Sequence, residues 1–230
     1  MLKGLFVYFS KIELMLWSVS VTLIVTSFFV FGSNSFLSLV ASLIGVTSIL
    51  MNAKGNPFGQ LLMIIFSLLY GIISFTFAYY GEMITYLGMT MPMSVFALVS
   101  WLRHPYNGKR SVVQIGVVSK PETVFMFFLS TAVTAVFYYI LRYFNTANLI
   151  PGTISVTTSF LAVYLTFRRS PYFSLAYAAN DIVLIVLWSL ASVADNRYIS
   201  VAVCFAAFLI NDIYGFINWQ RLKRQQIDAL

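Results

Sequence analysis

The chain has 230 residues, of which 60% are hydrophobic and only 9% are charged. Soluble domains are about half apolar and a quarter charged, so this composition excludes an ordinary soluble protein and leaves no segment polar enough for a separate soluble domain. The net charge of +7 does not indicate a nucleic-acid partner, because the basic residues lie between the apolar segments, where they orient membrane helices.

Eight apolar segments are long enough to cross a bilayer, which takes roughly 20 helical residues. In chain order the predicted spans are Ile12–Phe31, Phe36–Met51, Phe58–Tyr79, Met83–Leu102, Thr123–Tyr143, Gly152–Phe167, Tyr172–Val193 and Tyr198–Trp219. The N-terminal segment has no small-residue cleavage site, so the first span is expected to be permanent. The sequence therefore predicts an all-α polytopic membrane protein with one transmembrane domain, residues 1–230.

The basic residues predict the orientation of the spans. Twelve of the fourteen Lys and Arg residues fall at one end of the predicted bundle: Lys3, Lys11, Lys54, Arg103, Lys109, Arg110, Lys120, Arg168, Arg169, Arg221, Lys223 and Arg224. Only Arg142 and Arg197 fall at the other end. Because positive charge is enriched on the cytoplasmic side of membrane proteins, both termini are expected to be cytoplasmic.

The single cysteine and the single histidine limit the chemistry. Cys204 lies within an apolar segment, so no disulfide can form within the chain, and His104 lies in a basic loop. No metal or cofactor is expected.

Two pairs of residues indicate an internal repeat. Pro57 and Pro171 each follow positive charge and open a span, and they are 114 residues apart. Trp101 and Trp219 each end a span just before basic residues, and they are 118 residues apart. The competing interpretation is that any two triplets of membrane helices look alike.

If the repeat holds, residues 36–102 and 152–219 form two three-helix units. Residues 123–143 then form a linking span, and residues 12–31 form an extra N-terminal span. A single linking helix makes the two units parallel, which gives a 3+1+3 core. Transporters built from such repeats bind their substrate at the repeat interface near the membrane midplane.

Polar and ionisable side chains inside membrane spans are costly, so they are candidates for function. The candidate substrate-binding residues lie on the third, seventh and eighth spans: Gln60, Tyr70, Tyr177, Asn180, Asp181, Trp188, Asn211 and Tyr214. Amides and carboxylates accept hydrogen bonds from hydroxyl groups, while aromatic faces stack on rings or attract cations. For the amides, interhelical packing is an equally good interpretation. Asp181 is harder to explain in this way, because no Lys or Arg lies within a span to pair with it.

Pro92 in the fourth span is predicted to kink its helix, since it lacks the N–H group of a regular helical residue. The kink is either a hinge or a static packing feature, and the sequence does not choose between them.

The segment from Phe36 to Arg221 resembles the PnuC nicotinamide riboside transporters of bacteria. The resemblance depends on the order of several short motifs: Asn56-Pro57-Phe58-Gly59, Tyr80-Gly81-Glu82, Arg168-Arg169, Asn180-Asp181 followed by Trp188, and Tyr214-Gly215 followed by Trp219. It implies a fold related to the SWEET transporters, a homotrimer in the bacterial cytoplasmic (inner) membrane, and inward movement of nicotinamide riboside by facilitated diffusion. A cytoplasmic kinase would then phosphorylate the riboside and trap it. The extra first span is expected to be peripheral.

If nicotinamide riboside is the ligand, the candidate substrate-binding residues have the following predicted roles. Trp188 and Tyr177 would stack on the pyridinium ring, and Asp181, Asn180 and Gln60 would make polar contacts. Asn211 and Tyr214 rank second, with Asp212 orienting them.

The sequence supports three other functions to different degrees. A carrier for another small ring-bearing solute (thiamine, riboflavin, a deoxynucleoside or a sugar) stays open, because ring and hydroxyl recognition look alike. An intramembrane aspartyl protease is disfavoured because both Asp181 and Asp212 follow asparagine, not the Tyr-Asp and Gly-x-Gly-Asp pairs of those enzymes. A retinal photoreceptor is excluded because no span carries a central lysine. The protein is therefore not expected to be an enzyme.

Overall fold

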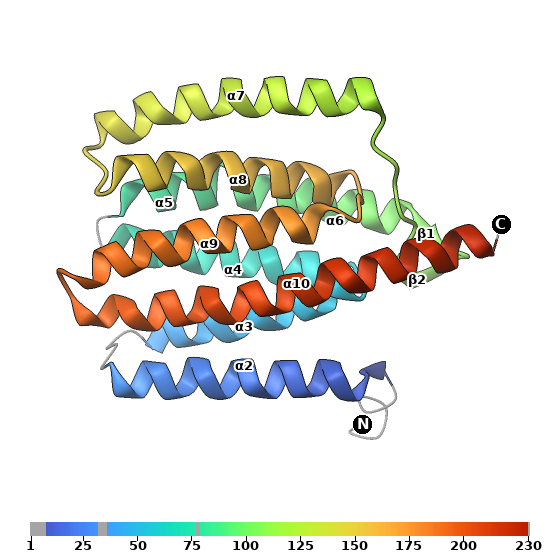
Figure 1. The fold of residues 1–230 in the computed structure, drawn as a ribbon, viewed down its shortest axis with the longest axis horizontal. Coiled ribbons are helices and arrows are strands. Elements are labelled where there is room, and N and C mark those ends of the chain that lie inside the picture. The colour runs from blue at the N-terminus through green and yellow to red at the C-terminus, as the bar shows by residue number, and fades with distance from the viewer. Residues whose placement is uncertain (1–7, 32–35, 77–78, 230) are drawn as a thin grey trace.

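The computed structural model describes residues 8–31, 36–76 and 79–229, so Lys3 lies outside the described part. Within that part, eight helical segments are long and apolar enough to cross a membrane (Figure 1). They are α2 (Lys11–Val30), α3 (Phe36–Ala53), α4 (Phe58–Thr76), α5 (Tyr80–Thr85) continued by η1 (Tyr86–Thr90) and α6 (Met91–Arg103), α7 (Lys120–Tyr143), α8 (Leu149–Phe167), α9 (Phe173–Ser192) and α10 (Ile199–Asp228). The prediction of eight spans is confirmed.

Two polar features at the end of the bundle were not predicted. Helix α10 continues past Trp219 to Asp228, and a short hairpin of β1 (Pro105–Tyr106) and β2 (Lys109–Val113) follows α6. The Gln226 side chain joins them, because its Nε2 donates to the carbonyl of Val113 over 3.0 Å. Both features are polar, so a search for apolar segments does not find them.

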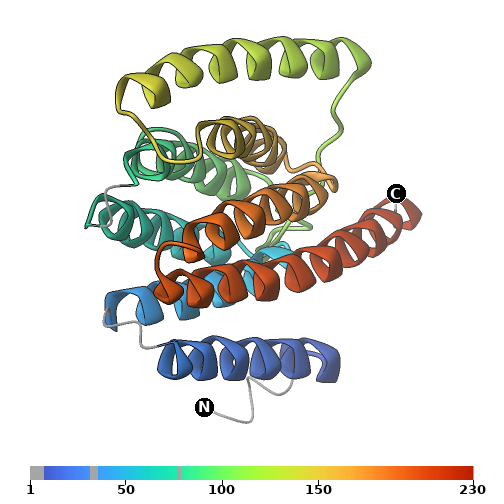
Figure 2. The ribbon, with the colours of Figure 1, turned by 60° about the vertical axis from the view of Figure 1, so that its left-hand side comes forward.

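Six spans form a closed ring. The helices in contact, in order around the ring, are α3, α4, α6, α8, α9 and α10, and α10 returns to α3. Helix α2 packs outside this ring against α3 and α10, and α7 packs outside it against α8. Figures 1 and 2 show α2 and α7 at opposite edges of the molecule. The ring therefore encloses a centre to which both predicted repeats contribute three consecutive helices.

The two ends of the bundle differ in charge as the sequence predicted. One end, here called the basic end, holds the start of α2, the α3–α4 and α8–α9 connections, the hairpin and the C-terminal part of α10 (Figure 1). Every described basic residue lies at this end except Arg142 and Arg197, which lie at the opposite end. Both described termini of the chain are at the basic end.

A reciprocal pair of hydrogen bonds agrees with the predicted repeat. Trp101 in the first unit donates its Nε1–H to the carbonyl of Thr166 in the second over 2.9 Å. Trp219 in the second unit donates to the carbonyl of Asn52 in the first over 2.8 Å. Asn52 and Thr166 are 114 residues apart, the same offset as the two prolines. The two units therefore contact each other through equivalent residues.

The fourth span departs from a regular α-helix just before Pro92. Residues Tyr86–Thr90 form a π-helix, in which the Met91 N–H donates to the carbonyl of Tyr86, five residues back. Pro92 follows in the first turn of α6, where its missing N–H costs little. The irregularity predicted at this proline is thus a π turn, a feature that is frequent at functional sites.

Candidate substrate site

A cavity lies at the centre of the six-helix ring. Its lining comes from both repeats: Ile49, Asn52, Met63, Phe66, Tyr86, Thr90, Ser159, Phe173, Tyr177, Asn180, Asp181, Phe205, Phe208 and Asp212. The free space inside is about 30 Å³, room for one or two water molecules. Sites for small organic ligands enclose about 300–1,000 Å³, so the helices must move apart before this cavity admits such a ligand. The structure therefore shows the site in a closed form.

Two buried carboxyl groups line the cavity. Asp181 on α9 and Asp212 on α10 are each 4% exposed, and both line the cavity close enough to interact electrostatically. The Oδ2 atom of Asp181 has no hydrogen-bond partner among the described residues. Two carboxylates in contact repel each other when both are charged, and a cation beside them removes that repulsion. No lysine or arginine is among the residues that line the cavity.

Uncharged polar groups lie in the cavity wall and directly behind it. The Oδ1 atom of Asn180 accepts hydrogen bonds from the hydroxyls of Thr158 (2.8 Å) and Ser159 (3.0 Å), which fixes the orientation of its amide. Gln60 donates from Nε2 to Oδ1 of Asn52 over 2.9 Å, while its buried Oε1 has no partner among the described residues. Unpartnered buried acceptors cost free energy, so they are typical of sites that a ligand completes.

Aromatic side chains close the cavity at the basic end. Phe173 lines the cavity and packs against Trp219 with ring centroids 4.7 Å apart. Trp101 packs behind both, 5.4 Å from Trp219. Both tryptophans are fully buried. This layer separates the cavity from the basic end.

A second aromatic layer lies toward the opposite end. Tyr86 lines the cavity and packs against Tyr70 with centroids 4.4 Å apart. Tyr70 contacts Trp188 at 6.3 Å, and Trp188 contacts Tyr79 at 4.7 Å. The cavity is thus enclosed between two sets of aromatic rings.

The structure brings some of the predicted site residues together and separates others. Tyr177, Asn180 and Asp181 line the cavity. Gln60 is one hydrogen bond away, through Asn52. Tyr70 and Trp188 belong to the aromatic layer toward the opposite end and do not line the cavity in this closed form.

Asn211 and Tyr214 face away from the cavity. Asn211 donates to the hydroxyl of Ser20 on α2 over 2.8 Å, and the Tyr214 hydroxyl donates to Glu13 on α2 over 3.0 Å. The predicted ranking on α10 was therefore the reverse of the geometry, because Asp212, given only an orienting role, lines the cavity. The helix explains the difference, since Asp212 is turned about 100° from Asn211.

Several lining residues were not predicted. On α10, Phe205, Phe208 and Asp212 recur at spacings of three and four, which places them on one face of the helix. The stripe of aromatic residues leading to an aspartate was a signal that the sequence contained. Tyr86 and Thr90 depend on the π turn, which changes which side chains of the fourth span face inward and which apolar periodicity does not reveal.

Comparison with known proteins agrees with this architecture. Residues 35–221 match the sequence profile of the family described as nicotinamide mononucleotide transporter. The chain belongs to this family. A nicotinamide riboside transporter PnuC from Neisseria mucosa is 27% identical over 202 residues, which cover 86% of this chain and 76% of the relative. A nicotinamide riboside transporter PnuC from Haemophilus influenzae is 22% identical over 195 residues, 84% of this chain and 82% of the relative.

The fold is also that of a solved structure. A crystal structure of the vitamin B3 transporter PnuC superposes with a TM-score of 0.82 at 23% identity, covering 95% of this chain and 94% of that one. The family match makes the protein a membrane transporter and not an enzyme.

Proposed function

We propose that the protein carries nicotinamide riboside across the bacterial cytoplasmic membrane by facilitated diffusion. The observation that carries this proposal is that Asp181 and Asp212 both line a cavity whose other lining side chains are aromatic, amide, hydroxyl and apolar. Nicotinamide riboside has a flat cationic ring, ribose hydroxyls and a carboxamide that both donates and accepts. The carboxyl pair suits the cation, aromatic faces such as Tyr177 suit the ring, and the free Oε1 of Gln60 suits a donor.

The lining favours the riboside over the mononucleotide. A phosphate group carries up to two negative charges, and proteins bind it with Arg, Lys or helix N-termini. The cavity instead presents two carboxyl groups and no basic side chain. A phosphorylated ligand would therefore be repelled where the riboside is attracted. This agrees with the names of the two relatives, which specify the riboside.

Thiamine is the second candidate, because it also has a cationic ring and a hydroxyl group. Riboflavin, deoxynucleosides and sugars are uncharged under ordinary conditions, so the carboxyl pair gives them no such advantage. Thiamine lacks the carboxamide, so it has no such group to form hydrogen bonds with the amides of Asn180 and Gln60. We therefore rank thiamine second to nicotinamide riboside as the substrate.

The transport cycle follows from the position of the cavity between the two repeats. Opening the Trp101–Phe173–Trp219 layer would expose the site at the basic end, and opening the Tyr70–Trp188 layer would expose it at the other. We propose that the basic end is cytoplasmic, that the site lies near the midplane, and that cytoplasmic phosphorylation traps the riboside. The homotrimer that the family resemblance implies is part of the same proposal.

Equilibrium binding to the purified protein tests the ligand. Nicotinamide riboside, nicotinamide mononucleotide, nicotinamide, thiamine and riboflavin are titrated separately by calorimetry. The riboside should bind at least tenfold more tightly than the mononucleotide and thiamine. Tighter binding of the mononucleotide would contradict the electrostatic argument, and tighter binding of thiamine would replace the riboside with the second candidate.

A further inference from the structure

The starts of α2 and α7 share a short sequence that extends the internal repeat. Residues 10–13 read Ser-Lys-Ile-Glu and residues 119–122 read Ser-Lys-Pro-Glu. In both, the serine is the residue that caps the helix, and its hydroxyl accepts from the backbone N–H of the glutamate. The helix outside the first unit therefore starts in the same way as the helix that links the two units.

The two glutamates also bind equivalent cations. Glu13 pairs with Lys54, 2.9 Å away, directly after α3. Glu122 pairs with Arg168, whose Nη2 donates to Oε2 over 2.9 Å, directly after α8. Lys54 and Arg168 are 114 residues apart, the offset that relates the two repeats. Each repeat is thus a four-helix unit, whose first helix is fastened by a glutamate to the end of the second.

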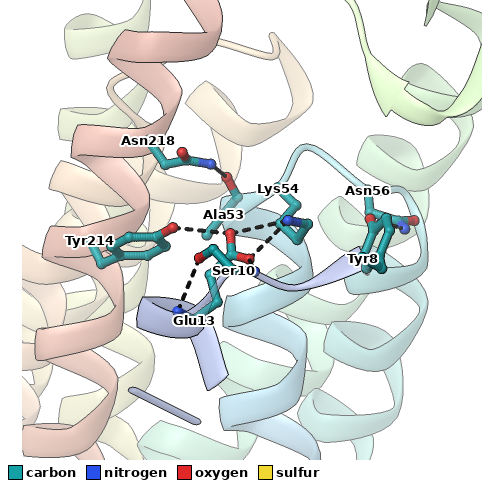
Figure 3. Close-up of polar contacts among 8 residues, drawn as sticks. All are labelled: Tyr8, Ser10, Glu13, Ala53, Lys54, Asn56, Tyr214 and Asn218. Atoms are coloured by element: carbon teal, nitrogen blue, oxygen red, sulfur yellow. Dashed lines mark hydrogen bonds and ion pairs between the residues drawn. The ribbon is translucent and has the colours of Figure 1, made fainter. Parts of the chain in front are cut away.

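The second partner of each glutamate distinguishes the two halves. The Tyr164 hydroxyl donates to Glu122 over 3.3 Å, and Tyr164 belongs to the same helix, α8, that leads to Arg168. Glu13 instead accepts from Tyr214 over 3.0 Å, and Tyr214 is on α10 of the other half. Figure 3 shows Glu13 between Lys54 and Tyr214. One carboxylate, 2% exposed, therefore connects both halves at the basic end.

The neighbouring contacts also join the two halves between α3 and α10. Asn218 of α10 donates to the carbonyl of Ala53 over 2.8 Å (Figure 3), one residue after the Asn52 carbonyl that Trp219 binds. Farther from the basic end, the Ser20 hydroxyl on α2 accepts a hydrogen bond from the Asn211 amide on α10. If the basic end opens by separating α10 from the end of α3, the Glu13–Tyr214 bond lies across the opening.

We propose that Glu13 is a positioning residue for transport, which holds α10 against α3 and favours the conformation closed at the basic end. Helix α2 is then part of the moving mechanism and not a peripheral addition. The proposal rests on the proposed alternating opening of the two ends, but it does not depend on which solute is carried. Glu122 makes the same ion pair without joining the halves, so it is a matched internal control.

Cysteine accessibility tests the proposal without any substrate. Ser174 is 1% exposed and lies beside Gly215 between α9 and α10 at the basic end, so Ser174→Cys in a Cys204→Ala background reports opening there. The rate of labelling by a bulky charged maleimide is measured in this background, alone and with Glu13→Gln or Tyr214→Phe. The matched controls are Glu122→Gln and Tyr164→Phe.

Loss of one hydrogen bond shifts a two-state equilibrium by roughly twofold to tenfold, so Tyr214→Phe should raise the labelling rate by that factor. Glu13→Gln should raise it at least as much, and both control variants should leave it within twofold of the background. Equal rises in Tyr164→Phe and Tyr214→Phe would indicate general loosening and overturn the proposal. An unchanged rate in well-folded Tyr214→Phe would also overturn it, and that variant keeps Lys54 paired if Glu13→Gln fails to fold. None of these outcomes depends on riboside binding.

Discussion

The indole rings of Trp101 and Trp219 lie 5.4 Å apart, and each donates its N–H to a main-chain carbonyl of the other half of the molecule. The acceptors, on Asn52 and Thr166, each lie one residue before the end of their helices, α3 and α8, which are equivalent in the predicted repeat. This reciprocity is the arrangement expected at the basic end if the predicted repeat holds.

We expect Trp101→Phe and Trp219→Phe to weaken the basic-end closure by similar amounts. Each removes one buried hydrogen bond, worth about 0.5–1.5 kcal/mol, while the ring packing is largely kept. Both variants should lower the thermal unfolding midpoint. Trp17→Phe is the control, because the half-exposed Trp17 also loses a hydrogen bond, to Thr47, but between α2 and α3 and not within the basic-end layer. A large shift in only one of the two buried variants would contradict their equivalence.

Removal of one cavity carboxylate should weaken binding of the cationic riboside. Asp181→Asn keeps the shape of the side chain and removes its charge, so affinity should fall by about 1–3 kcal/mol, measured by calorimetry. Asp195→Asn is the control. Hydrogen bonds from Arg197 hold the pKa of the Asp195 carboxyl below its usual range, so this substitution also removes a negative charge, but at the opposite end. Unchanged affinity in a folded Asp181→Asn protein would make Asp181 a structural residue.

Asp181 and Asp212 should act as a unit. Because the two side chains line the same small cavity and interact electrostatically, the losses of affinity in Asp181→Asn and Asp212→Asn should not add in the double variant. The difference should be about 0.5 kcal/mol or more. Strict additivity in calorimetric measurements would mean that the two carboxyl groups meet the ligand independently.

The spans and half of the candidate site could be predicted from the sequence, because both depend on local patterns. Apolar length gives the eight helices, and the spacing on α9 places Tyr177 and Asp181 on the inner side. On α10 the prediction chose Asn211 and Tyr214, because polar residues occur on two faces of that helix. The position of α2 shows which face of α10 packs against another helix, because Ser20 and Glu13 of α2 are the hydrogen-bond partners of Asn211 and Tyr214.

The π turn before Pro92 should be needed for the cavity. Pro92→Ala restores a backbone N–H and favours a regular α-helix, which would rotate Tyr86 and Thr90 relative to α6. Helix stability should therefore be kept or increased, while riboside affinity falls. Thermal unfolding and calorimetry on the same sample separate the two effects. Full affinity together with a regular helix in a crystal structure would show that the π turn is only an adjustment to the proline.

Uptake into vesicles tests the central claim most directly. Purified protein is reconstituted into liposomes without kinase or ATP, and entry of labelled nicotinamide riboside is followed at zero membrane potential, because a potential alone would concentrate a cation. We predict that internal riboside rises to the external concentration and no further, with or without a proton or sodium gradient, and that unlabelled riboside competes while the mononucleotide does not. Accumulation above the external concentration under a gradient would show ion coupling and contradict facilitated diffusion. Uptake no faster than in protein-free liposomes would contradict the assignment of nicotinamide riboside as the substrate.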